Sequence, residues 1–241
     1  MSFTYLITGA SRSLGLGFAT ELLAQRPDAR IIAAARNPEK ADGLQKLIQQ
    51  YGKDKLYLLK MDVEDKASVE SAAKELESSG FLENGGLDAL INNAGVARHH
   101  ELKPSQITAD SVLANLGPNF FGVINVNSGF LPLLRKGKGK EIYALSSLTG
   151  SIGQWGVNAQ TTSYSISKVS LNMYLSKLAA ELKDEGFKVT MFHPGYVATD
   201  MNSYGGDISI KEATESSTKN VFLSSHPSPS FINYKGETLL W

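Results

Sequence analysis

The sequence predicts one α/β domain, in which helices cover both faces of a parallel sheet of about seven strands. The main observation is that short apolar runs of strand character alternate with longer helical stretches along the chain. Most connections are short and carry turn residues, so no interdomain linker is predicted. The chain has 241 residues, of which 42% are hydrophobic and 20% charged. This length suits a single domain over residues 1–241 with a substantial core.

Strands and helices are predicted in alternation, each strand from a short apolar run and each helix from a longer stretch. The strands are Phe3–Thr8, Arg30–Ala35, Lys55–Met61, Leu87–Asn92, Glu141–Ser146 and Lys188–Phe192. The helical stretches are Leu14–Gln25, Leu44–Tyr51, Lys66–Ser78, Ser111–Leu134 and Tyr164–Glu185. Because crossovers between parallel strands are right-handed, a doubly wound arrangement of the Rossmann type is the expected topology. The last residues, Phe231–Trp241, are apolar enough to dock on the domain.

One uncharged stretch, Ser111–Leu134, resembles a membrane span in hydropathy alone. Its polar content argues against that reading, since it carries the amides Asn115, Asn119, Asn125 and Asn127 together with Pro118. Amide groups are costly to bury in lipid. The stretch is therefore interpreted as a helix buried inside the protein or at a subunit contact.

Composition narrows the classes of function. The formal net charge is zero, which argues against a nucleic-acid or membrane partner held by charge. The chain has no cysteine, so disulfides, thiolate catalysis and cysteine–zinc sites are excluded, and a cytoplasmic location is expected. The four histidines show no metal-ligand spacing, and no metal site is predicted. The N-terminal residues do not form a targeting segment.

A glycine-containing loop follows the first predicted strand and leads into the first helix. It reads Thr8-Gly9-Ala10-Ser11-Arg12-Ser13-Leu14-Gly15. Backbone N–H groups of such a loop, together with the helix N-terminus, can face a pyrophosphate. We therefore expect a dinucleotide cofactor at this loop, bound by Gly9, Ser11, Arg12, Ser13, Leu14 and Gly15.

The choice of dinucleotide is predicted from the end of the second strand. An NAD site commonly places an acid there, about 20 residues after the glycines, to bind the ribose 2′-hydroxyl. Here the strand ends in alanines followed by Arg36, and the first acid is Glu39. A guanidinium binds a 2′-phosphate through charge-assisted hydrogen bonds, and Arg12 offers a second one. The predicted cofactor is NADP(H).

Tyr164 and Lys168 form a YxxxK pair, which on a helix places both side chains on one face. A free tyrosine has a pKa near 10. Nearby positive charge from Lys168 and from a nicotinamide would favour the phenolate and bring that pKa toward the operating range of a general acid. Tyr51 and Lys55 have the same spacing, but Gly52 separates them at a helix end and the surrounding motifs are missing. That second pair is assigned to chance.

The order of the motifs resembles that of the short-chain dehydrogenase/reductase superfamily. The matching segments are a TGxxxGxG-like loop at 8–15, NNAG at 92–95, an SSxxG-like segment at 146–150, YxxxK at 164–168 and PGxVxT at 194–199. The resemblance covers nearly the whole chain. The motif order and the YKGETLLW ending point to the carbonyl-reductase-like, or sniffer-like, branch. Ser13 stands where the loop pattern has its middle glycine and adds a Cβ there.

The resemblance implies further cofactor contacts beyond the phosphate loop. These are Asp62 and Val63 at the adenine, Asn93, Ala94 and Gly95 at the end of the fourth strand, the tyrosine–lysine pair Tyr164 and Lys168, and Pro194, Gly195, Val197 and Thr199 near the nicotinamide. Asn93 would steady the sheet end beside the cofactor. Val197 and Thr199 would contact the carboxamide and orient the nicotinamide ring.

The resemblance also implies a catalytic set. Ser147 would hydrogen-bond the substrate carbonyl, Tyr164 would donate the proton, and Lys168 would lower the tyrosine pKa while holding the ribose. Asn119 would hold a water that relays protons toward the lysine, with Asn115 as the alternative. The connection from Ser147 to Tyr164 is longer than is usual in the family. An insertion around 154–161, including Trp155, is expected to form one wall of the pocket.

The implied function is NADPH-dependent reduction of a small-molecule ketone or aldehyde to an alcohol. The alternative is a non-catalytic NADP(H)-binding redox sensor on the same fold, because fold alone does not fix function. The polar, glycine-containing segment Asp200–Glu215 is expected to be a mobile substrate loop. The segments Ser111–Leu134 and Tyr164–Glu185 could pair in a homodimer or homotetramer, and a monomer is the other possibility.

Overall fold

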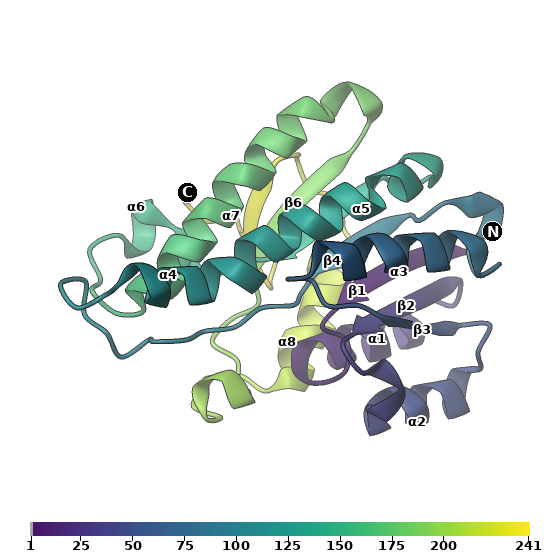
Figure 1. Ribbon diagram of the computed structural model, residues 1–241, viewed down its shortest axis with the longest axis horizontal. Helices are drawn as coiled ribbons and strands as arrows, with labels where there is room; N and C mark the ends of the chain where they lie inside the picture. The colour runs from purple at the N-terminus through teal and green to yellow at the C-terminus, as the bar shows by residue number, and fades with distance from the viewer. Residues whose placement is uncertain (1) are drawn as a thin grey trace.

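A computed structural model of the protein describes residues 2–241. Its centre is one seven-stranded parallel sheet with the strand order β3-β2-β1-β4-β5-β6-β7 (Figure 1). The strands are β1 Phe3–Thr8, β2 Ala29–Ala35, β3 Leu56–Lys60, β4 Ala89–Asn92, β5 Glu141–Leu145, β6 Lys188–His193 and β7 Ser230–Asn233. All the pairings are parallel, as the alternating sequence pattern predicted. The predicted fold class is confirmed.

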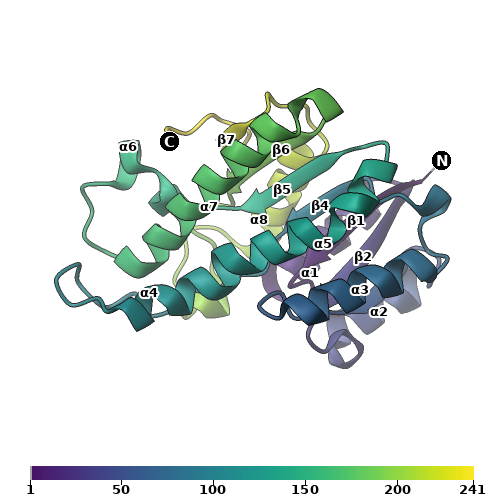
Figure 2. The same cartoon turned by 45° about the horizontal axis from the view of Figure 1, so that its top comes forward.

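Helices cover both faces of the sheet (Figures 1 and 2). The longer ones are α1 Ser13–Gln25, α2 Asp42–Tyr51, α3 Lys66–Ser78, α4 Ala109–Leu116, α5 Gly122–Lys136, α7 Thr162–Glu181 and α8 Ile210–Ser217, and α6 is the short helix Ile152–Trp155. Helices α1, α2 and α8 pack together on one face, while α3, α5 and α7 with α4 lie on the other. Each face has its own hydrophobic core, built around Phe18 and Phe192 on the first and around Phe130 and Leu175 on the second.

The long segment Ser111–Leu134 is helical throughout, as predicted, and contains a π-helical turn between α4 and α5. Helix α4 begins at Ala109, a π-helical turn follows at Gly117–Phe121, and α5 continues to Lys136. Pro118 explains the π-helical turn, because a proline has no N–H to give to the carbonyl four residues earlier and its ring crowds that carbonyl. The carbonyl of Ala114 instead accepts from the Arg98 guanidinium at 3.2 Å.

The expected substrate loop is shorter than predicted. Its second half, from Ile210 onward, is the start of α8, in which Ala213 and Thr214 are buried. Thr214 lies directly against Gly17 of α1, where a Cβ would have no space. A mobile loop over 200–215 is therefore wrong for this half, because the apolar face of α8 packs on α1. Residues 200–209 remain outside any long helix or strand.

The C-terminal residues dock on the sheet, as predicted. Strand β7 lies at the sheet edge beside β6, and Thr238 folds back onto Ile232 in an antiparallel bridge. Leu239 packs against the core on the α5 and α7 face. Among residues 2–241 no helix is both long and apolar enough to cross a membrane.

Candidate active site

The loops after β1 and β4 are joined by one group of hydrogen bonds. The Thr8 hydroxyl accepts from the backbone N–H of Asn93 and of Ala94, both at 3.0 Å. In return the Asn93 amide donates to the Thr8 carbonyl at 2.8 Å and to the Gly9 carbonyl at 3.3 Å. Because both strands end here, this network fixes the phosphate loop against the NNAG segment.

The phosphate loop has the form of an anion cradle. Gly9 has φ +66°, and a Cβ on Gly15 would collide with the Gly9 carbonyl and the Asn93 amide, so both positions require glycine. No side chain among the described residues caps the first turn of α1, and that turn contains no acid. Free N–H groups at the positive end of a helix suit a pyrophosphate. The donor set therefore fits the predicted dinucleotide.

Ser13 adopts φ +49°, the left-handed region in which glycine has no steric penalty. The sequence placed this serine at the position where the resembling loops have glycine, and the backbone here keeps the conformation that glycine would adopt. A serine in this region costs about 1–2 kcal/mol relative to relaxed backbone. The phosphate loop therefore carries local strain at Ser13.

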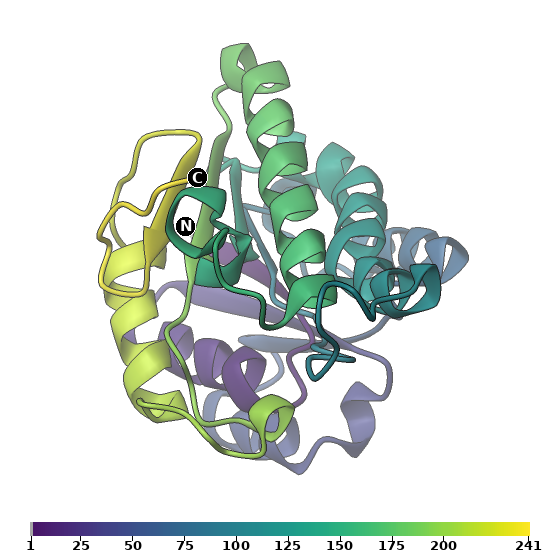
Figure 3. The same ribbon diagram turned by 90° about the vertical axis from the view of Figure 1, so that its left-hand side faces the viewer.

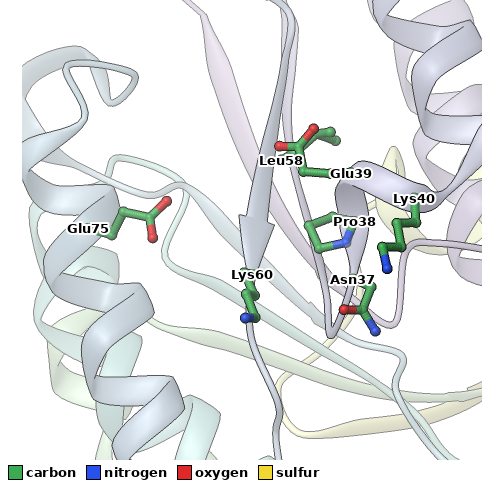
Figure 4. A pocket seen from close by; sticks show the side chains of 7 residues that line it. All are labelled: Asn37, Pro38, Glu39, Lys40, Leu58, Lys60 and Glu75. Atoms are coloured by element: carbon green, nitrogen blue, oxygen red, sulfur yellow. The ribbon is translucent and has the colours of Figure 1, made fainter.

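Arg12 and Arg36 were predicted to bind a 2′-phosphate, and both are exposed at the carboxyl ends of the strands. Arg36 follows β2 directly. Arg12 forms an ion pair of 2.7 Å with Asp200, the first residue of the substrate loop. Beyond Arg36, a hollow of about 200 Å³ is lined by Lys40 and Lys60, with Glu75 of α3 on its far side (Figure 4). Glu39 lines the same hollow, so two lysines and two carboxylates balance each other there.

The predicted adenine residues lie at the end of β3. The Asp62 carboxylate accepts from the Glu64 N–H at 3.1 Å, and its own N–H donates to the Ser68 hydroxyl at 3.0 Å. The Val63 carbonyl accepts from the Asn125 amide of α5 at 3.1 Å. These contacts hold the loop after β3 beside α5.

Tyr164, Ser147 and Lys168 meet at the end of β5. Ser147 follows the strand and is buried, and Tyr164 and Lys168 lie one turn apart on α7. The Lys168 ammonium donates to the Leu145 carbonyl at 2.6 Å and lies 5.6 Å from the centre of the Tyr164 ring. Tyr164 is half-buried and makes a side-chain hydrogen bond with Ser147. The structure thus brings the three predicted residues together.

The pKa of Tyr164 departs from the sequence expectation. Burial raises it to about 12, and the hydrogen bond with Ser147 opposes only part of that rise. Burial also lowers the pKa of Lys168 to about 8. Desolvation therefore dominates the tyrosine pKa in this structure, where the Lys168 ammonium donates to Leu145, and the lowering by Lys168 together with a nicotinamide charge stays a prediction. The phenol keeps its proton at neutral pH, the form that a proton donor needs.

Asn119 and Asn115 are both fully buried, so burial does not distinguish the two candidates and their hydrogen-bond partners must. The Asn119 side chain exchanges two hydrogen bonds of 2.8 Å with the Val96 backbone and donates to the Ser167 hydroxyl of α7 at 3.0 Å. The Asn115 side chain binds the backbone of Arg98 and of Ser111. Asn119, in the π-helical turn, is therefore the asparagine whose side chain contacts the helix that carries Tyr164.

The PGxVxT segment follows β6. Gly195 has φ +93°, and Val197 forms an isolated parallel bridge with Ile208. Thr199 is buried and caps the turn Asp200–Asn202. His193, at the end of β6, has its pKa lowered to about 4 by burial, so it is neutral at pH 7 and offers no competing acid. Pro194 is buried beside it.

Sequence reasoning missed residues that support this site. Thr8 was read only as part of a loop pattern, yet its hydroxyl binds the NNAG backbone. Asn172 accepts from the Ser146 hydroxyl at 2.6 Å and donates to the Gly150 carbonyl at 3.2 Å, which fixes the segment around Ser147. Its position four residues after Lys168 on the same helix was a signal that could have found it.

The protein has a seven-stranded parallel sheet, and a phosphate loop and a serine–tyrosine–lysine group lie together at the carboxyl ends of its strands. This combination defines a dinucleotide-binding oxidoreductase. The comparisons with known proteins agree. The family model for short chain dehydrogenase matches residues 4–207. A short-chain dehydrogenase of Penicillium roqueforti is 33% identical over 93% of this chain and 89% of its own length. Oxidoreductase BOA17 of Botryotinia fuckeliana is 36% identical over 83% of this chain and 68% of its own.

Solved structures extend the likeness over the whole chain. The NADPH-bound carbonyl reductase from chicken fatty liver superposes with a TM-score of 0.89 at 29% identity, and the carbonyl reductase Sniffer of D. melanogaster with 0.90 at 27%. Both alignments cover 100% of each chain. The chain belongs to the short-chain dehydrogenase family, in its carbonyl-reductase-like branch. It is an oxidoreductase, and its fold is one that binds nicotinamide cofactors.

Proposed function

We propose that this protein uses NADPH to reduce a ketone or aldehyde to an alcohol, with Tyr164 as the proton donor. The observation that carries the proposal is the grouping of Tyr164 with Ser147 and Lys168 at the sheet edge that also holds the phosphate loop. Tyr164 as a whole is half-buried. A hollow of about 470 Å³ between residues 100–105 and 159–160 lies before the first turn of α7.

Each residue then has a defined task. Ser147 donates a hydrogen bond to the carbonyl oxygen and orients it, and the Tyr164 hydroxyl transfers its proton to that oxygen as charge develops there. The Lys168 ammonium, close to the phenol ring, stabilises the phenolate that remains and is positioned to bind the ribose. NADPH, when bound, supplies the hydride. Because the phenol is protonated at neutral pH, it is in the form that can donate a proton to the carbonyl oxygen.

The side chain of Asn119 is not available to hold a relay water in this proposal. Its side-chain amide is already used by Val96 and Ser167. A relay water at Asn119 would therefore have to bind its backbone carbonyl. The π-helical turn supports this, since such turns loosen the regular pattern of backbone hydrogen bonds and are frequent at functional sites.

NADP(H) is the proposed cofactor because Arg12 in the phosphate loop and Arg36 after β2 are exposed where a 2′-phosphate would bind, and no acid ends β2. A cytoplasmic location is proposed with it, on the lack of cysteine.

The test is to mix the protein with NADPH and diacetyl and to follow the cofactor absorbance. Consumption that depends on both protein and diketone is the expected result. NADPH binding without turnover of any carbonyl compound would instead support the redox-sensor alternative. Absence of both binding and turnover would refute both.

A further inference from the structure

The connection between Ser147 and Tyr164 contains a helix too short to be stable alone. Helix α6 has four residues, Ile152–Trp155, and helices of this length are marginal without tertiary contacts. The Ser151 hydroxyl caps it by accepting from the Gln154 N–H at 3.0 Å. Ile152 is mostly exposed and Val157, just beyond the helix, is fully exposed. Some other part of the protein must hold this connection in place.

Residues 239–241 provide that contact. The Gly153 N–H, one of the donors that the first turn of a helix leaves unpaired, donates to the Trp241 carbonyl at 2.8 Å. The Leu240 N–H donates to the Gln154 side chain at 3.1 Å. All three views show the C-terminal end beside α6 (Figures 1, 2 and 3).

Gly153 allows this close approach. An ideal Cβ at this position would lie 3.2 Å from both the Leu240 Cβ and the Trp241 carbonyl oxygen, closer than nearly all real contacts of that kind. The φ of Gly153 lies outside the left-handed region, so its backbone conformation alone does not call for glycine. A side chain at this position would require residues 240 and 241 to shift by a few tenths of an ångström.

The same segment is anchored to the sheet. The Leu239 N–H donates to the Phe231 carbonyl of β7 at 2.9 Å, and the Trp241 ring lies 5.6 Å from the ring of Phe231, which is buried. Residues 239–241 thus connect the edge strand of the sheet to α6. The rigid sheet is in this way coupled to the connection that separates two residues of the catalytic group.

We infer that residues 239–241 position α6 and thereby determine which carbonyl substrates reach Ser147 and Tyr164. The inference rests on the proposed function. Gly153, Leu240 and Trp241 act here as positioning residues, remote from the proton transfer. Displacement of the loop should therefore affect large substrates more than small ones, because only large substrates extend to the connection.

The experiment compares wild type with Trp241→Ala and Gly153→Val, and uses Leu223→Ala, a similarly exposed apolar residue, as the control. Benzil and diacetyl are the paired probes, since both are diketones and differ only in phenyl against methyl groups. The KM for benzil should rise about tenfold in both variants, as expected for a displaced binding wall. The KM for diacetyl and the Kd for NADPH should change less than about twofold on the same argument.

Hydrogen exchange supplies a readout that is independent of activity. The amide of Gly153 should exchange about fivefold faster in Trp241→Ala, because loss of the ring contact with Phe231 loosens the segment whose Trp241 carbonyl accepts from that amide. Unchanged exchange would overturn the positioning, and altered exchange with equal KM changes for both diketones would overturn the effect on specificity. If wild type reduces neither diketone, the proposed function fails, and the exchange comparison still decides whether 239–241 hold α6.

Discussion

The cofactor side and the substrate side of the site lie at the same edge of the sheet, but they are built differently. On the cofactor side, Thr8 and Asn93 bind each other's backbone and Gly15 packs where no Cβ fits. On the substrate side, residues 151–161 and 196–209 form short turns and leave Val157 and Tyr204 largely exposed. Close packing of backbone against backbone tolerates few residues, whereas exposed loops tolerate many.

The comparison shows which side chains of the site are held firmly and which are held by few contacts. Groups that must meet a constant cofactor are held by buried hydrogen bonds, and groups that meet a variable substrate are held by a few contacts at loop ends. The catalytic group lies between the two regions. The following predictions test this division in order of expected effect.

Tyr164→Phe should have the largest effect. The change removes the phenol and keeps the ring, so activity with diacetyl should fall by roughly 10²–10⁴, the usual contribution of a general acid. NADPH binding, which depends on the other region, should be retained. Tyr51→Phe is the control, because Tyr51 ends α2 away from the site. A Tyr164→Phe protein with more than about a tenth of wild-type turnover would contradict the assignment.

Arg36→Ala should separate the two cofactors. One charge-assisted hydrogen bond is worth about 1.5–3 kcal/mol, so NADPH affinity should fall roughly 10- to 150-fold. NADH lacks the 2′-phosphate and should be affected far less, and Ala35→Asp in addition should shift preference toward it. Kinetics with both cofactors measure this. A wild type that prefers NADH, or equal losses for both cofactors, would show that Arg36 does not bind the 2′-phosphate.

The pH profile should report Lys168. Its pKa of about 8 lies below the ordinary lysine value, so the ammonium is lost as the pH rises through 8. The kcat/KM for NADPH, which reports groups of the free enzyme, should fall above that pH and approach a tenfold loss per pH unit. Lys168→Arg keeps its charge and should lack this decline, although its absolute rate is lower. A flat wild-type profile up to pH 10 would be inconsistent with a need for the charged lysine.

Ser13→Gly should relieve the strain in the phosphate loop. A glycine has no penalty at φ +49° but costs about 0.5–1 kcal/mol of backbone entropy, which leaves a net gain of about 1 kcal/mol in stability. A higher Tm is expected, with NADPH binding unchanged or tighter. If titration shows a clear loss of NADPH affinity, Ser13 instead donates a useful hydrogen bond to a phosphate.

Asp200→Asn should have the smallest effect. It removes an ion pair that joins the cofactor side to the substrate side. Arg12 is paired with Asp200 at 2.7 Å, and the change frees Arg12 for a 2′-phosphate. Exposed pairs are worth about 0–1 kcal/mol, so NADPH should bind up to about fivefold tighter while NADH is unaffected. Calorimetric titration of both cofactors measures the difference. Equal changes for NADPH and NADH would mean that the pair acts only on the loop.

Local sequence signals predicted most of the fold. Strand β1 and helix α3 occur at the predicted residues, because apolar runs of strand length and a helical stretch with charged faces are local properties. The π-helical turn within the segment 111–134 was not predicted, although Pro118 was noted, because a proline inside a helix can also end it or kink it. The helix α8 was missed because its apolar face is short and is buried by tertiary packing on α1.

By itself the sequence determined the parallel α/β fold, the phosphate loop and the residues of the serine–tyrosine–lysine group, since each depends on residue type and spacing along one chain. The tertiary structure alone decided that Asn119 rather than Asn115 contacts α7, that burial raises the Tyr164 pKa, and that residues 239–241 hold α6. Hydrogen bonds between distant segments and desolvation depend on which groups the folded chain brings together, and local spacing does not contain that information.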